Sequence, residues 1–291
     1  DTSNILGRDT DGSSTGGQSW YDMSLAVSTT DENHIIVGGI NLWESTDGGV
    51  TWDISGSSGN GSNYSYMHVD QHATEFNPLN NTAYAGNDGG LYKYFNNLNT
   101  WIDISDGLEI SQFYKLGLSK NSDYTLVVGA QDNGTERLSG TTWDAIRGSD
   151  GMECIIDQYN DDIIYSTSQY GGLRVTYNGG VDWNNIKPVS YEGSWVTPYK
   201  MHPLDNNVLV AGYNVVYKSS TGGASWDSIS PSYGGLKTIA LAPSNLDYIY
   251  AATYSGLWVT KDDGQNWNYI KNGLPGGTIS DVTVSNLDPD R

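Results

Sequence analysis

The sequence predicts an all-β fold of the β-propeller type, in which four-stranded antiparallel blades repeat around a central channel. Three observations predict it. Tryptophans recur at spacings of 49, 42, 40, 43 and 41 residues: Trp52, Trp101, Trp143, Trp183, Trp226 and Trp267. Each period contains three short apolar runs, separated by glycine and Asn/Asp turns, before its tryptophan. No segment has a helical period, and repeats of this kind are typical of propeller blades.

The last complete repeat shows the order of its elements. Residues 238–242 are predicted as strand A, residues 248–253 as strand B and residues 256–260 as strand C. Strand D follows a tight turn and covers residues 267–270. A blade therefore runs from an inner strand A to an outer strand D.

The turn between strands C and D carries the most specific motif of the chain. Residues 45–52 fit the pattern S-x-D-x-G-x-x-W in full, and residues 260–267 fit it with Thr in place of Ser. The Asp or Asn side chain is expected to accept backbone N–H bonds within its turn, and the glycine to adopt a conformation closed to other residues. We interpret the following residues as structural: Asp47, Trp52, Asn178, Trp183, Trp226, Asp262 and Trp267.

Strand A can be placed seven times, but the seventh copy is incomplete. Residues 20–277 are predicted to form six blades, and residues 278–291 to begin a seventh that lacks its later strands. Residues 1–19 are interpreted as an N-terminal tail or as part of the closing blade. We expect the native chain to be longer, and the incomplete seventh blade to favour self-association through its unpaired strand.

The composition is strongly acidic. Thirty-four acidic residues against fourteen basic ones give a formal net charge of −20. This balance argues against a nucleic-acid partner, because phosphates require Lys and Arg. No apolar run reaches the ~18 residues of a membrane span. Cys154 lies in an apolar run and is expected to be a buried, inert thiol.

The turn motif resembles the Asp-box (BNR) repeats of sialidases, xyloglucanase-type glycoside hydrolases and sortilin-type propellers. A closer similarity covers nearly the whole chain and joins it to secreted Bacteroidota propeller proteins described as glycosyl hydrolase-like, through residues 20–23, 68–72, 86–90, 131–134 and 150–153. The resemblance implies an extracellular or cell-surface location and leaves activity open. A sialidase is not expected, because those enzymes hold the substrate carboxylate with an arginine cluster and this chain has five arginines.

Chemistry is expected where the D–A and B–C connections meet, at the opposite end of the blades from the motif turns. Asp88 and Asp132 are the candidate catalytic pair of a glycoside hydrolase, one protonated and one ionised. Together with Asp150 they are also candidate ligands of Ca²⁺, although no cofactor is required. The simpler interpretation is that these aspartates only make tight turns. A zinc site at His68 and His72 is less favoured.

The remaining candidates are binding residues, with the aromatic ones as stacking surfaces for sugars: Trp20, Asp70, His72, Asp150, Glu153, Tyr170, Trp195 and Tyr254. We expect a secreted or cell-surface module that binds a polysaccharide or a surface protein, or builds an extracellular assembly, without catalysis. The alternative is a glycoside hydrolase acting on a neutral polysaccharide. Four sequons are candidate glycosylation sites: Asn60, Asn63, Asn80 and Asn133.

Overall fold

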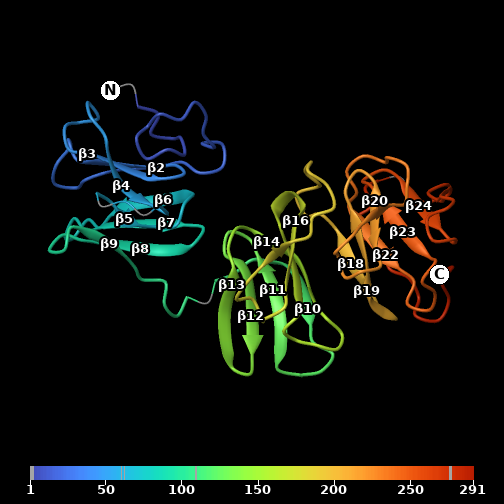
Figure 1. The fold of residues 1–291 in the computed structure, drawn as a ribbon. Helices are drawn as coiled ribbons and strands as arrows, with labels where there is room; N and C mark the ends of the chain where they lie inside the picture. The colour runs from blue at the N-terminus through green and yellow to red at the C-terminus, as the bar shows by residue number, and fades with distance from the viewer. Residues whose placement is uncertain (1–2, 60, 62, 109, 275–276) are drawn as a thin grey trace. The chain divides into compact units, whose positions relative to one another are not determined.

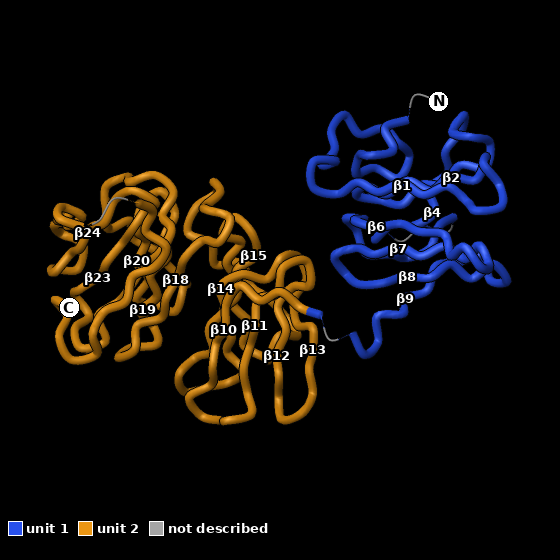
Figure 2. Tube along the Cα trace, turned by 180° about the vertical axis from the view of Figure 1, so that it is seen from behind, with its two compact units in different colours: residues 1–110 blue, residues 111–291 orange. Residues whose placement is uncertain are grey.

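The computed structural model describes residues 3–59, 61, 63–108, 110–274 and 277–291. Within these residues the chain forms 25 strands in six sheets, together with the 3₁₀ turn η1 (Gln169–Gly171) (Figure 1). The sheets are distributed over two compact units, residues 1–110 and residues 111–291 (Figure 2). The predicted all-β class and its six blades are confirmed. No helix in the described part of the chain is long and apolar enough to cross a membrane.

Unit 1 contains blades one and two. Blade one pairs in the order β1 (Ser24–Val27), β2 (Ile35–Gly38), β3 (Leu42–Ser45), β4 (Asp53–Ser57) and β5 (Ser65–Tyr66), of which β5 joins β4 in parallel. Blade two pairs in the order β6 (Gln71–Phe76), β7 (Ala83–Asn87), β8 (Gly90–Phe95) and β9 (Thr100–Asp103). Apolar side chains of both blades form one buried core, which includes Leu42, Met67, Phe76 and Trp101.

Unit 2 contains blades three to six, all antiparallel. Blade three consists of β10 (Phe113–Leu118), β11 (Thr125–Ala130), β12 (Gly134–Ser139) and β13 (Thr142–Arg147). Blade four consists of β14 (Gly151–Ile156), β15 (Ile164–Ser168), β16 (Gly172–Thr176) and β17 (Asn184–Asn185). Blade five consists of β18 (Tyr199–His202), β19 (Asp205–Gly212), β20 (Val216–Ser219) and β21 (Asp227–Ser228). Blade six consists of β22 (Thr238–Leu241), β23 (Ile249–Ala252), β24 (Leu257–Thr260) and β25 (Asn268–Tyr269), close to the predicted ranges.

Four of the repeated tryptophans connect neighbouring blades within their unit. In unit 2 the indole N–H groups of three of them donate to a backbone carbonyl at the outer strand of the preceding blade: Trp183 to Ile146 (2.9 Å), Trp226 to Ile186 (2.8 Å) and Trp267 to Ile229 (2.7 Å). In unit 1 the Trp101 indole donates to the Ser55 hydroxyl (3.0 Å). The ring thus fills space between two blades while its one polar atom is satisfied.

The C–D turns are closed by their own side chains, as the motif predicts. In blade one the Gly49 N–H donates to Ser45 Oγ (2.8 Å) and the Thr51 N–H donates to Asp47 Oδ1 (2.9 Å). Gly49 has φ +89°, which a side chain would disfavour. The hydrogen bond from the Thr51 hydroxyl is the main cause that lowers the pKa of Asp47 to about 2. The same two backbone bonds recur in blades four, five and six.

Residues 277–291 follow blade six without forming a strand. Val282 and Val284 pack against the blade-six core, and the Thr238 hydroxyl donates to Asp281 (2.8 Å). The segment predicted to begin a seventh blade therefore lies against the inner strand of blade six.

Candidate functional site

An exposed aromatic pair lies where blades four and five connect. Tyr170 belongs to η1, the B–C turn of blade four, and Trp195 lies in the connection from β17 to β18. Their ring centroids are 5.1 Å apart and their planes are nearly perpendicular, at 84°. The Tyr170 N–H donates to the Trp195 carbonyl (3.1 Å), and the Gly193 N–H donates to the Tyr170 carbonyl (3.0 Å). The two side chains remain 41% and 40% exposed, so the rings are both fixed and accessible.

A hydrogen-bond chain to blade three anchors this pair. The Trp195 indole N–H donates to the Tyr114 hydroxyl (2.9 Å), which donates in turn to Gln131 Oε1 (2.6 Å). Tyr170 has φ +57°, a backbone conformation that is uncommon outside glycine and persists only where its surroundings fix it. Because the indole N–H is already engaged, the Trp195 side chain offers a ligand mainly its ring face. Fixed aromatic faces suit the apolar face of a sugar ring.

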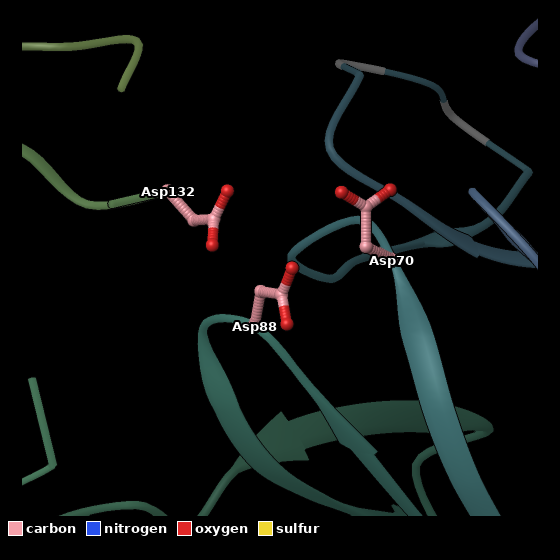
Figure 3. Close-up of side chains that lie close together, drawn as sticks. All are labelled: Asp70, Asp88 and Asp132. Atoms are coloured by element: carbon pink, nitrogen blue, oxygen red, sulfur yellow. The ribbon is translucent and has the colours of Figure 1, made fainter. Parts of the chain in front are cut away.

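Three carboxyl groups form a row in unit 1. Asp22 precedes β1, Asp70 precedes β6, and Asp88 lies in the β7–β8 turn. Figure 3 shows the side chains of Asp70 and Asp88, together with Asp132 of unit 2. Carboxylate oxygens of Asp70 and Asp88 lie within 4.8 Å of each other. The Gln18 amide donates to Asp22 Oδ2 (3.0 Å) and to Asp70 Oδ1 (2.5 Å), so it connects Asp22 with Asp70.

Asp70 is the member of the row whose pKa is raised. Burial, followed by the charge of Asp22 and a hydrogen bond shared with it, raises the pKa of Asp70 to about 7. Asp22 is fully buried, and its Oδ1 has no N–H or O–H donor among the described residues. A protonated Asp70 supplies that donor. A carboxyl whose pKa is raised close to neutral pH, beside a second carboxyl group, is the arrangement that acid catalysis uses.

Asp88 is held by a different set of partners. The Tyr21 hydroxyl donates to Asp88 Oδ2 (2.8 Å), and His72 Nε2 lies 2.7 Å from Asp88 Oδ1. The Tyr21 ring packs edge-on against the His72 imidazole, with centroids 4.9 Å apart. Trp20 lies beside Tyr21 and is 86% exposed. The predicted residues Trp20, Asp70, His72 and Asp88 are therefore brought together in unit 1.

The structure places the remaining predicted acids in unit 2. Asp132 has φ +61° in the β11–β12 turn, and its N–H donates to Asp150 Oδ1 (2.9 Å). Glu153 is buried and accepts a hydrogen bond from Lys200 Nζ (2.7 Å), between the inner strands of blades four and five. Asp150 and Glu153 thus each have a partner within the blades. Of the predicted catalytic pair, Asp88 belongs to unit 1 and Asp132 to unit 2.

The other predicted residues have separate surroundings. Tyr254 is 58% exposed and its ring lies beneath Lys237 Nζ, 5.3 Å from the centroid. His68 Nδ1 lies 3.2 Å from the Val69 carbonyl.

The four sequons differ in how they lie. Asn60 falls outside the described residues. Asn63 and Asn80 are exposed. Asn133 is partly buried and donates its amide to the Gln131 carbonyl (3.0 Å), so a glycan there would replace that bond.

The arginines near the acidic loops hold blades together. The Arg147 guanidinium donates to the carbonyls of Ser166 and Gly172, each at 2.6 Å, and burial is the main cause that lowers its pKa to about 10. Arg137 forms an ion pair with Asp162 at 3.1 Å. Both side chains are engaged within the blades.

Sequence reasoning missed Asp22, Gln18, Tyr21 and Tyr114. A signal existed for Asp22, because it lies just before the inner strand of its blade, as Asp70 does in the next blade. No sequence signal indicated that Asp22 is buried, or that Tyr114 supports Trp195 from 81 residues away.

The comparisons support the fold. No protein-family model matches the sequence, and no curated protein does. Among solved structures, the chain is similar to an ancestral GH74 enzyme, with TM-score 0.50 and 16% identity over 87% of this chain and 31% of that chain. It is also similar to the GH74 xyloglucanase from Xanthomonas campestris, with TM-score 0.54 and 14% identity over 84% and 40% of the two chains. The WD40 β-propeller domain of Doa1 matches with TM-score 0.47 and 10% identity over 92% and 87%. The chain thus spans less than half the length of both GH74 structures, and at these identities the likeness shows the propeller fold alone.

Proposed function

We propose that the chain is a secreted β-propeller module that binds neutral glycan chains without cleaving them. The observation that carries this proposal is the Tyr170–Trp195 pair, whose rings are about 40% exposed and held perpendicular to each other. Side chains fixed before binding lose little conformational entropy when a ligand arrives. The pair therefore supplies a preformed stacking surface rather than a flexible one.

The charge of the protein supports a neutral ligand. A net charge of −20 repels anionic polysaccharides. The same charge keeps an extracellular protein soluble, which fits the location implied by the sequence resemblance. A surface protein that carries such glycans is a natural partner for this module.

Isothermal titration calorimetry with neutral oligosaccharides tests the proposal. Trp195→Ala and Tyr170→Ala are each expected to weaken binding about tenfold or more, equivalent to ~1.4 kcal/mol. Tyr159→Ala is the matched control, because Tyr159 is 73% exposed in the A–B turn of blade four and takes no part in the pair. If the control weakens binding as much as the other two variants do, the pair is not the site. If the parent binds no oligosaccharide and releases no product, the glycan function is wrong.

A second candidate function is glycoside hydrolysis in unit 1. The observation that favours it is the Asp70 carboxyl, whose pKa is raised to about 7 and which lies within 4.8 Å of Asp88. In this function Asp70 would protonate the leaving oxygen of the glycosidic bond, and Asp88 would act on the opposite side of the sugar.

Mass spectrometry of soluble products separates the two functions. The parent and the Asp70→Asn and Asp88→Asn variants would be incubated with neutral polysaccharides, with Asp53→Asn, an exposed aspartate of the same unit, as control. Products released by the parent and the control, and lost in both site variants, would establish hydrolysis. Intact polysaccharide with every protein would leave the binding function.

A further inference from the structure

The connection that follows blade one departs from the repeat. Trp52 and Trp101 are 49 residues apart, whereas the later tryptophans follow one another at 40 to 43 residues. This longest interval contains β5, which pairs with β4 and, among the described strands, is the one that pairs in parallel. The Ser65 hydroxyl of β5 accepts a hydrogen bond from the Trp101 N–H (2.8 Å). The additional strand therefore lies between the outer strands of blades one and two.

A groove of about 730 Å³ lies beside β5, between the outer strands of these two blades. A volume in this range suits a ligand far larger than a single ion. Hydroxyl and amide side chains line both walls, among them Thr46 of blade one and Thr100 of blade two. The charged residues in the described lining are the acids Glu44 and Asp53, with no Lys, Arg or His beside them. The whole lining belongs to unit 1.

The two carboxylates differ in what already binds them. Glu44 Oε1 lies 2.6 Å from His34 Nε2, and Glu44 Oε2 accepts a hydrogen bond from the Ser55 hydroxyl (3.2 Å). These contacts fix the Glu44 side chain, which remains 25% exposed. Asp53 is exposed, and its carboxylate has no hydrogen-bond or ion-pair partner among the described residues. The groove thus presents one fixed carboxylate, whose charge His34 shares, and one carboxylate whose charge is not shared.

The negative charge acts inside the groove. Burial, followed by the charge of Glu44, raises the pKa of Tyr94, another lining residue, whose hydroxyl donates to Asn99 Oδ1 (2.5 Å). An anionic ligand would meet the same repulsion as an ionised Tyr94, whereas a cation would neutralise the charge of Asp53. The net charge of −20 adds a long-range attraction for cations. The ligand that fits this groove is therefore cationic.

The neutral lining decides between kinds of cation. A polyamine offers only N–H donors, whereas the hydroxyl and amide side chains of the groove both donate and accept hydrogen bonds. A peptide backbone has a donor and an acceptor at most residues, and in an extended segment alternate side chains point the same way. Basic side chains at every second position would then face the carboxylates while the backbone pairs with the neutral side chains.

We propose that this groove binds an extended, basic peptide segment of a partner protein. The inference goes beyond the proposed glycan binding and does not depend on it, because the groove shares no residue with the Tyr170–Trp195 pair. The groove also shares no residue with the carboxyl row of Asp70 and Asp88, so Asp53 takes no part in the hydrolysis considered for that row.

Fluorescence anisotropy with a labelled hexapeptide of alternating lysine and serine tests the proposal, at about 50 mM NaCl because salt screens such contacts. Two pairs of variants separate the groove from the general acidity of the protein. Thr46→Lys and Leu98→Lys each replace an exposed lining side chain by a cation, one on each wall. Val50→Lys and Asn97→Lys are the matched controls, which make the same change of charge at exposed positions of the same two turns, outside the lining.

Each lining variant is expected to weaken peptide binding about tenfold, and each control less than about threefold. The four replaced side chains are exposed, so all four melting temperatures should stay close to that of the parent. Equal weakening by the lining variants and the controls would show that the peptide responds to net charge alone, and the groove would then not be the site.

Two further ligands complete the test. A hexapeptide with glutamate in place of lysine should not bind, and spermine should bind more weakly than the lysine peptide. If the parent does not bind the lysine peptide, or binds spermine as tightly, the proposal is overturned. Calorimetry with neutral oligosaccharides should give the same affinity for Thr46→Lys as for the parent. A failure of glycan binding is thereby distinguished from a failure of peptide binding.

Discussion

Asp70 makes the stability of unit 1 depend on pH in a direction unusual for an aspartate. Its pKa rises from an ordinary 3.8 to about 7 in the folded protein. The folded state therefore binds more protons than the unfolded state between these values, and stability falls as pH rises through that window. If the whole pKa difference acted on stability, the loss would be roughly 4 kcal/mol, at ~1.4 kcal/mol per pKa unit. Because Asp70 is only half-buried, solvent screening reduces the expected loss to on the order of 1–2 kcal/mol.

Asp70→Asn is expected to remove this loss. The amide can donate to Asp22 Oδ1 at every pH. The difference in unfolding free energy between variant and parent should therefore shift by about 1–2 kcal/mol in favour of the variant from pH 4.5 to pH 8.5. Hydrogen-exchange mass spectrometry over a urea series, followed on peptides from β6–β9, reports unit 1 by itself. Asp53→Asn is the control and should show no such pH dependence. A stability difference between Asp70→Asn and parent that stays constant from pH 4.5 to 8.5 would refute the assignment of the proton to Asp70.

Three further predictions concern His34, Trp226 and Gly134. The contact of His34 Nε2 with Glu44 Oε1 (2.6 Å) raises the pKa of His34 above 6.5, so its stabilisation is complete below pH 6.5 and is lost as pH rises through the folded pKa. NMR titration should show His34 titrating above 6.5 in the parent and lower in Glu44→Gln, and equal midpoints would contradict the pairing. Trp226→Phe removes the bond to the Ile186 carbonyl and should cost about 1–3 kcal/mol in denaturant unfolding. Trp143→Phe, at a 49% exposed ring, should cost less, and a reversed order would count against the role of the indole bonds. A Cβ at Gly134 would lie 2.1 Å from the Arg147 carbonyl, at φ +81°, so Gly134→Ala should lower the melting temperature far more than Gly140→Ala, which meets open space at φ +65°. Similar melting temperatures for the two variants would show that the backbone segments at Gly134 and Arg147 can move apart without cost.

The local features of the fold were predictable because local chemistry causes them. The alternation of short apolar runs with glycine and Asn/Asp turns predicts each strand, and blade six matches its prediction closely. The turn from Ser45 to Trp52 closes through bonds between residues at most four positions apart. Such contacts are visible in any window of sequence that contains both partners.

The candidate sites were predicted only in part, because their members are far apart in sequence. Tyr170 and Trp195 were each expected at the ligand-binding end of the blades, but not as a perpendicular pair held by Tyr114. Asp70 was expected as a binding residue, but its raised pKa depends on its own burial and on the charge of Asp22, 48 positions earlier. Hydrogen bonds and burial between blades depend on register and packing that no local pattern records.

The sequence by itself determined that this chain is an acidic, all-β repeat protein of six blades closed by side-chain-capped turns. Only the tertiary structure decided which polar groups are satisfied. Among the described residues it left the Tyr233 hydroxyl, in the connection from blade five to blade six, without a partner, where the preceding interface, between blades four and five, pairs Tyr191 with Tyr217. It also placed Asp22 close enough to Asp70 for the charge of Asp22 to raise the pKa of Asp70. The physical reason is that the cost of a charge or a hydroxyl depends on its access to water and on its neighbours, and both are fixed only when the blades pack.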